Sequence, residues 1–233
     1  SGYLPSASCR VRVPNVFFTN CAAATRHINS LPNVTLATRY DFTTTGGGAI
    51  DIDKALMCWY PSFAQPYSVK LSNVGIMSQL LVSEIASPVS WSQVGVGPGG
   101  QNSQVALSMA TCLAGGTVSD SVFTRANLTA ASSYVTSMTD VAGITFDNVR
   151  WQSPLYRVAT TTGAQTLTRV NDVMFKNNVF GGGGALITTC TDIIYTGTVY
   201  YDHPATTSFI TAMQVWSLAS SCARMKFDGL TFG

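Results

Sequence analysis

A six-residue pattern of apolar and polar positions recurs along this chain. The pattern is a large apolar residue, any residue, Asn or Gly, two residues of any kind, and a second large apolar residue. Its copies are VPNVFF (13–18), LPNVTL (31–36), LSNVGI (71–76), FDNVRW (146–151), FKNNVF (175–180), YTGTVY (195–200) and FDGLTF (227–232). Such self-similarity is typical of repeat architectures, in which each copy is one structural unit.

The last four copies align over a longer stretch, with four apolar columns. These columns are Val141, Val170, Cys190 and Cys222; Ile144, Val173, Ile193 and Met225; Phe146, Phe175, Tyr195 and Phe227; and Trp151, Phe180, Tyr200 and Phe232. The second and third columns lie two residues apart, which is the period of side chains on one face of a β-strand. The pattern therefore predicts strands whose apolar columns face a common core.

The third position of the pattern predicts a turn. Only Asn and Gly occupy it, and these residues best tolerate the left-handed backbone region. The predicted turn ladder comprises Asn15, Asn33, Asn73, Asn148, Asn177, Gly197 and Gly229. An Asn side chain can also hydrogen-bond a neighbouring copy, so we expect strand, one-residue corner and strand to repeat up a stack.

The spacing of the turn positions indicates how the copies are distributed. Successive positions are separated by 18, 40, 75, 29, 20 and 32 residues. About 20 to 30 residues suit one coil of a stacked repeat, so the intervals of 40 and 75 indicate unrecognised coils or inserted loops. Within the longest interval, SVFTRANLT (121–129) is interpreted as a degenerate copy.

These features predict an all-β fold, a right-handed parallel β-helix (a β-solenoid), as one domain over residues 1–233. The clearest coils are expected over 141–233 and looser coils over 10–80. Because the chain stops inside a unit with an apolar inner face, whereas solenoid ends need a polar cap, we expect a fragment of a longer protein. An antiparallel β-sandwich or jelly roll is the alternative, since it also contains short β-branched and aromatic strands.

Charge is scarce in this sequence. Only 10% of residues are charged and the net charge is +2, whereas about 25% is usual for soluble domains. The basic residues form no cluster and no apolar run could span a bilayer, so we expect neither nucleic-acid binding nor membrane insertion. The six Cys form no C-x-x-C pair, and the motifs of phosphate loops and nucleophile elbows are absent. We therefore expect no metal and no cofactor.

The Asn and Gly ladder with its stacked aromatic and aliphatic columns resembles the pectin-lyase-like right-handed β-helix proteins. The resemblance covers residues 141–233 well and 10–80 loosely. The low charge and abundant Ser, Thr, Gly and Ala are most similar to the shaft of a bacteriophage tailspike or tail fibre. The resemblance implies a homotrimer in the virion tail that contacts other tail proteins and binds, and often cleaves, host surface polysaccharide. A secreted protein is the alternative location.

Two aspartates form the best catalytic constellation in the sequence. Asp172 and Asp192 occupy the column three residues before the aromatic one in adjacent copies, and Arg224 follows in the same column. Adjacent rungs would place the carboxylates about 5 Å apart, the separation of a retaining glycosidase. The alternative interpretation is that both aspartates lie in polar turns before strands. Asp51 with Asp53, and Asp202 with His203, are weaker candidates.

Aromatic side chains outside the inner columns are candidates for contact with sugar rings. Tyr201 and Trp216 are the predicted glycan-binding residues, whereas Trp151 and Tyr200 belong to the core. Cys190 and Cys222 share an inner column and are expected to be buried thiols. The sequence leaves three functions open: a receptor-binding tail spike or fibre, a polysaccharide depolymerase of the same fold, and a jelly-roll coat or decoration protein. Whether the chain is an enzyme stays open as well.

Overall fold

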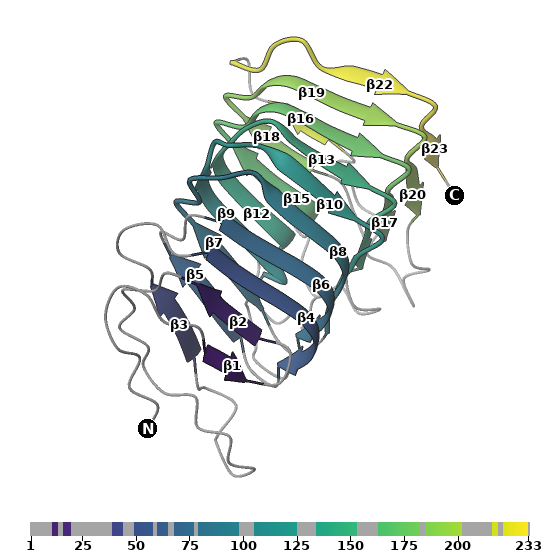
Figure 1. Ribbon diagram of the computed structural model, residues 1–233. Helices are drawn as coiled ribbons and strands as arrows, with labels where there is room; N and C mark the ends of the chain where they lie inside the picture. The colour runs from purple at the N-terminus through teal and green to yellow at the C-terminus, as the bar shows by residue number, and fades with distance from the viewer. Residues whose placement is uncertain are drawn as a thin grey trace.

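The protein is all-β, with long parallel sheets. The computed structural model describes residues 11–13, 16–19, 39–43, 49–57, 60–64, 68–76, 79–97, 105–124, 134–152, 163–181, 185–201, 216–218 and 221–232, with the backbone alone in β1 to β4, in β21 and at some residues of other strands. Strands are the only regular elements of these residues, and they stack from β1 and β2 at one end to β22 and β23 at the other (Figure 1).

The larger sheet has 15 strands. From β22 to β23 its order is β22 (Lys226–Asp228), β19 (Thr191–Thr196), β16 (Asn171–Lys176), β13 (Ile144–Asp147), β10 (Gly116–Ser119), β8 (Val89–Val96), β11 (Val122–Thr124), β14 (Arg150–Gln152), β17 (Val179–Gly181), β20 (Val199–Tyr201) and β23 (Thr231–Phe232). A branch continues from β8 to β6 (Ser68–Ile76), β4 (Ala49–Met57), β2 (Val16–Thr19) and β1 (Val11–Val13).

The smaller sheet has eight strands and lies opposite. Its order is β21 (Trp216–Leu218), β18 (Ala185–Thr188), β15 (Gly163–Thr168), β12 (Tyr134–Val141), β9 (Leu107–Cys112), β7 (Leu80–Ser83), β5 (Tyr60–Ala64) and β3 (Arg39–Thr43). Only β1 with β2 and β2 with β4 pair antiparallel; the other described pairs are parallel. An antiparallel sandwich or jelly roll does not have this pairing, whereas a β-helix is compatible with it.

Successive passes of the chain lie directly on one another. Phe146 pairs with Phe175, Phe175 with Tyr195, and Tyr195 with Phe227. Each pass contributes strands to both sheets, for example β12, β13 and β14, and the next pass adds β15, β16 and β17 alongside them. The register confirms the apolar columns that the sequence predicts.

The left-handed backbone region is used at three corner positions, although not at all three in every pass. The first corner holds Glu84, Thr111, Asp140, Arg169 and Thr189; the second holds Gly115, Gly143, Asp172, Asp192 and Arg224; the third holds Asn73, Gln93, Asp120, Asn148, Asn177, Gly197 and Gly229. Their φ values lie between 48° and 77°. One-residue corners let the chain change direction without breaking the ladders on either side.

The third corner is the predicted turn ladder. It confirms the positive φ of five predicted residues and adds Gln93 and Asp120, while Asn15 and Asn33 lie outside the described residues. The interval of 75 residues thus contains two unrecognised turns. The interpretation of residues 121–129 as the degenerate copy is wrong, because the turn residue is Asp120 and β11 already begins at Val122. Asp has a short polar side chain, as Asn does, and tolerates this conformation for the same reason.

Aromatic side chains stack rung on rung in the core. Ring centroids are 5.2 Å apart for Phe146 and Phe175 and 4.7 Å for Phe175 and Tyr195, with nearly parallel planes. Trp151 stacks between Phe123 and Phe180 and meets Phe146 edge-on at 5.3 Å. All six rings are fully buried. The parallel register places identical columns one rung apart, and ring stacking then follows from the strand spacing of about 4.8 Å.

Candidate functional site

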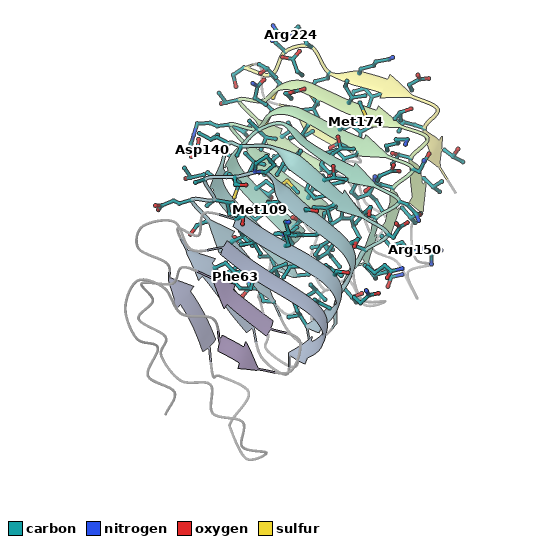
Figure 2. The ribbon with its side chains drawn as sticks, viewed as in Figure 1. Phe63, Met109, Asp140, Arg150, Met174 and Arg224 are labelled. Carbon is teal, nitrogen blue, oxygen red and sulfur yellow. The ribbon has the colours of Figure 1, made fainter. Side chains whose placement is uncertain are left out.

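The register brings the predicted carboxylates together. Asp172 lies opposite Asp192, since Asn171 pairs with Thr191 and Val173 with Ile193 on either side. Arg224 follows on the next pass, where Thr191 bridges to Ala223. All three have φ values between 51° and 54°, so they are second-corner residues. Asp172 and Arg224 are exposed and Asp192 is half-exposed, and Figure 2 shows Arg224 at the end of the stack. Their role in catalysis stays a prediction.

Arg224 holds Asp192 in a two-pronged ion pair. Its Nε and Nη2 atoms donate to Oδ1 and Oδ2 of Asp192, each at 2.5 Å. These hydrogen bonds lower the pKa of the Asp192 carboxyl and raise the pKa of the Arg224 guanidinium. Asp192 is therefore ionised at neutral pH and suits a nucleophile or base rather than an acid.

A second pair of this kind lies on the first corner. Arg169 Nε and Nη2 donate to the two carboxylate oxygens of Asp140 at 2.6 and 2.7 Å. The hydrogen bonds lower the pKa of Asp140 and raise that of Arg169. The sequence analysis missed this pair, although Asp140 and Arg169 lie 29 residues apart, one coil length. Its recurrence indicates that Asp–Arg pairs link successive passes.

The two predicted glycan-contact residues lie in different sheets. Tyr201 is in β20 and its backbone pairs with Gly181. Trp216 is in β21 and pairs with Ala185, a core residue whose side chain is 4% exposed. The backbone of Trp216 therefore occupies the register position that is held by a core residue, Ala185, in the neighbouring strand β18. Both side chains lie outside the described residues, so their contact with glycan stays a prediction.

The weaker carboxylate candidates are only partly described. Asp51 and Asp53 lie in β4, where they pair with Lys70 and Ser72, and their side chains lie outside the described residues. Asp202 and His203 lie outside them altogether. Among the described residues, no group of three or more His, Cys, Asp or Glu side chains is arranged to hold a metal ion.

Cysteines of the core are free thiols. Cys112 and Cys190 are buried and Cys222 is half-buried, so the expectation of a buried thiol is confirmed for Cys190. Burial raises the pKa of Cys112 to about 11 and also raises that of Cys190. A protonated thiol is a poor nucleophile, and these two side chains act as small apolar residues.

An array of hydroxyl groups lies on part of the outer face of the larger sheet. It comprises six residues in two adjacent columns, which we call the hydroxyl face: Ser90, Thr117 and Thr145 on β8, β10 and β13, and Ser72, Ser92 and Ser119 on β6, β8 and β10. Each column continues into a charged residue, Lys70 on β6 beside Ser90 and Asp147 on β13 beside Ser119. All six are exposed or half-exposed, while the intervening Leu71, Trp91 and Val118 are buried. No member is charged. The sequence signal was the alternation of Ser or Thr with apolar residues, as in SWS (90–92) and TVS (117–119).

Turn residues extend the hydroxyl face with amide and carboxylate groups. Asn73, Gln93, Asp120 and Asn148 follow the second column directly. Asn73 Nδ2 donates to Ser72 Oγ at 3.0 Å, and Asn148 Nδ2 donates to Asp120 Oδ1 on the preceding pass at 2.7 Å. These hydrogen bonds fix the side chains on the surface. The result is a regular lattice of polar groups about 4.8 Å apart between passes.

Comparison with family models, curated proteins and solved structures finds no match. Within the part of the chain that the structure describes, there is no helix long and apolar enough to cross a membrane.

Proposed function

We propose that the chain forms a right-handed parallel β-helix that serves as a structural and receptor-binding shaft of a bacteriophage tail spike or tail fibre. In this proposal the shaft is a homotrimer, attached to other tail proteins of the virion, and it contacts polysaccharide of the host surface. The same binding face would serve a secreted protein.

The hydroxyl face carries this proposal. Neutral polysaccharides present hydroxyl groups at regular intervals, and a protein surface of Ser, Thr, Asn and Gln side chains offers donors and acceptors without a costly unpaired charge. The parallel register repeats these groups at the strand spacing of about 4.8 Å. The neighbouring buried aromatic stack supports the strands from behind, so the polar groups lie on a rigid scaffold.

Removal of hydroxyl groups tests the proposal. A panel of neutral hexose oligosaccharides would be titrated by calorimetry against the parent and a Ser90→Ala, Thr117→Val double variant. Val keeps the β-branched shape of Thr, so the strand is preserved. Each lost hydrogen bond is expected to weaken binding by about five- to tenfold.

The matched control is Thr139→Val, because Thr139 is half-exposed in β12 of the smaller sheet. This variant should bind like the parent. Equal affinity of the double variant and the parent would contradict a role for the hydroxyl face. Light scattering of the parent tests the homotrimer separately, and a monomer would contradict that part of the proposal.

A depolymerase is the second candidate, favoured by the register that places Asp172 opposite Asp192. The test variants are Asp172→Asn and Asp192→Asn, because Asn tolerates φ values of 51° and 54° better than Ala. If the pair is catalytic, both variants should keep the circular dichroism spectrum and lose sugar release. Reducing-sugar assays on the same oligosaccharide panel provide the measurement. Unchanged sugar release in either variant would exclude that residue from the chemistry.

A further inference from the structure

A shallow concavity lies around the third corner from the hydroxyl face. Its volume is about 330 Å³, and its lining comprises Gly75, Ile76, Gly95, Val96, Gly97, Val122 and Thr124. The residues come from β6, β8 and β11 and from the residue after β8. Small-molecule sites commonly occupy about 300–1,000 Å³, so this concavity has room for a small ligand.

Two glycines make the floor of this concavity. Leu56, Gly75, Gly95 and Val122 occupy the same position on β4, β6, β8 and β11. The neighbouring Ile76 and Val96 are buried, so this position faces outward. Gly75 and Gly95 thus leave two successive rungs, about 10 Å, without a side chain. Val122, which is 36% exposed, stands at one edge of the gap.

The protein backbone does not require these glycines. Gly75, Gly95 and Gly97 are not among the described glycines with positive φ. A Cβ atom on Gly95 would have nothing within 4 Å, and one on Gly97 would meet only Ile76 O at 3.7 Å. Glycine weakens a strand interior and often marks the close approach of a ligand or of another backbone.

The chemistry of the rim indicates the class of ligand. None of the lining residues is charged, which favours a neutral occupant, and the charged residue beside them, Arg150, lies one rung beyond Val122 in the same column. Gln93 of the third corner precedes Gly95 by two residues, and on the opposite side Thr124 Oγ1 donates to Gln152 Oε1 at 3.3 Å. A protein partner would need about 800 Å² of surface, far more than two rungs supply. A sugar ring has one apolar face and a hydroxyl rim, which match this floor and these edges.

We propose that the concavity binds one neutral pyranose ring of a polysaccharide whose neighbouring units lie on the hydroxyl face. This inference rests on the proposed function and names a subsite at which the chain binds its glycan. The apolar face of the ring lies on Gly75 and Gly95, and Val122 limits its movement along the stack. Gln93, Thr124 and Gln152 offer amide and hydroxyl groups to its hydroxyl rim.

A single methyl group tests this subsite. Gly95→Ala places Cβ in open space, so the variant should fold and melt at the parent's temperature or slightly above it. The methyl would occupy the floor on which the ring lies. We expect the affinity of the Gly95→Ala variant for the neutral hexose oligosaccharides, measured by calorimetry, to be at least about tenfold lower than that of the parent. Gly97→Ala should weaken binding in the same direction.

The control is Ala110→Val, which adds a larger side chain to the smaller sheet. Ala110 is half-exposed in β9, so this variant should bind the oligosaccharides with the parent's affinity. If Gly95→Ala retains the parent's affinity while the Ser90, Thr117 double variant loses it, the subsite is wrong and the proposed function stands. If the parent binds no member of the panel, both are overturned. Saturation-transfer NMR on the bound oligosaccharide should show one ring with stronger contacts than its neighbours, and uniform contacts would also overturn the subsite.

Discussion

Single residues in the left-handed backbone region determine where this chain turns. Thirteen described residues other than Gly have positive φ. A side chain in this region costs about 1–2 kcal/mol relative to the ordinary conformation, so the surrounding ladders must hold each corner in place. Thr111 and Thr189 are the most strained of them, since their β-branched side chains rarely adopt φ values of 53° and 55°.

Replacement of Asn148 tests the corner directly. Asn148→Val loses the hydrogen bond to Asp120 and puts a β-branched residue at φ 55°. We expect the free energy of unfolding to fall by about 2–3 kcal/mol, measured by urea denaturation. Asn148→Gly also loses the hydrogen bond, but Gly adopts positive φ without strain, so this variant should lose less of the free energy of unfolding. Equal stability of the Val variant and the parent would contradict the strained corner.

Single corner residues could be predicted from the sequence only where the residue type was distinctive. The third corner could be predicted because Asn and Gly dominate it. The first corner could not, because Glu84, Thr111, Asp140, Arg169 and Thr189 share no property that favours positive φ. The glycine floor was missed for the opposite reason: glycine is ordinarily read as a turn residue, whereas Gly75 and Gly95 lie inside strands.

Strands of successive passes are linked at their ends by ion pairs. Asp140 pairs with Arg169, Asp147 with Lys176, and Asp192 with Arg224, each across one pass. These side chains are exposed, and exposed pairs contribute little to stability at ordinary salt concentrations. Their regular placement still favours the correct neighbour, since a pass in the wrong register would lose its partner.

Acid should weaken two of these links. The pKa values of Asp140 and Asp192 are lowered by hydrogen bonds from Arg169 and Arg224. A lowered folded-state pKa gives stabilisation that is complete above the unfolded value of about 3.9 and is lost as the pH falls through the folded value. The melting temperature of the parent should therefore drop more steeply below about pH 4 than that of an Asp140→Asn, Asp192→Asn double variant. Parallel melting curves against pH would contradict this.

At the scale of the whole molecule, the described residues share one continuous core. Buried side chains extend without interruption from Phe63 to Tyr195, and Cys222, Met225 and Leu230 pack against them partly buried. A stack of this kind is stabilised mainly by contacts between nearest neighbours. A defect in one pass should therefore weaken its two neighbours most.

Phe175 is fully buried in this core, stacked on Phe146 and Tyr195. Phe175→Ala should lower the free energy of unfolding by about 3–5 kcal/mol, because a cavity replaces a fully buried ring. Hydrogen exchange should show the loss of protection in β13, β16 and β19 first, with β6 and β8 less affected. A uniform loss along the chain would indicate that the stack unfolds as one unit.

The all-β class and the parallel stacking were predictable because the apolar columns recur at fixed positions. The candidate site was predictable only in part. Adjacent rungs bring Asp172 and Asp192 together as the alignment indicated, but the hydroxyl face depends on knowing that Ser90, Thr117 and Thr145 share one column. Gln93 and Asp120 conceal that register in the sequence, because neither matches the Asn or Gly of the repeat.

One connection in each pass tolerates large changes of length. Between the strand that follows the third corner and the next strand of the smaller sheet, the chain uses residues 125–133, 153–162, 182–184 or 202–215, while the registers on both sides stay aligned. Doubling the number of residues in a connection adds only about 0.6 kcal/mol to the entropic cost of closing it. Residues inserted between Gly181 and Ala185 should therefore leave the registers of β17 and β18 unchanged, and natural variants could differ in length at this point of the sequence without rebuilding the scaffold.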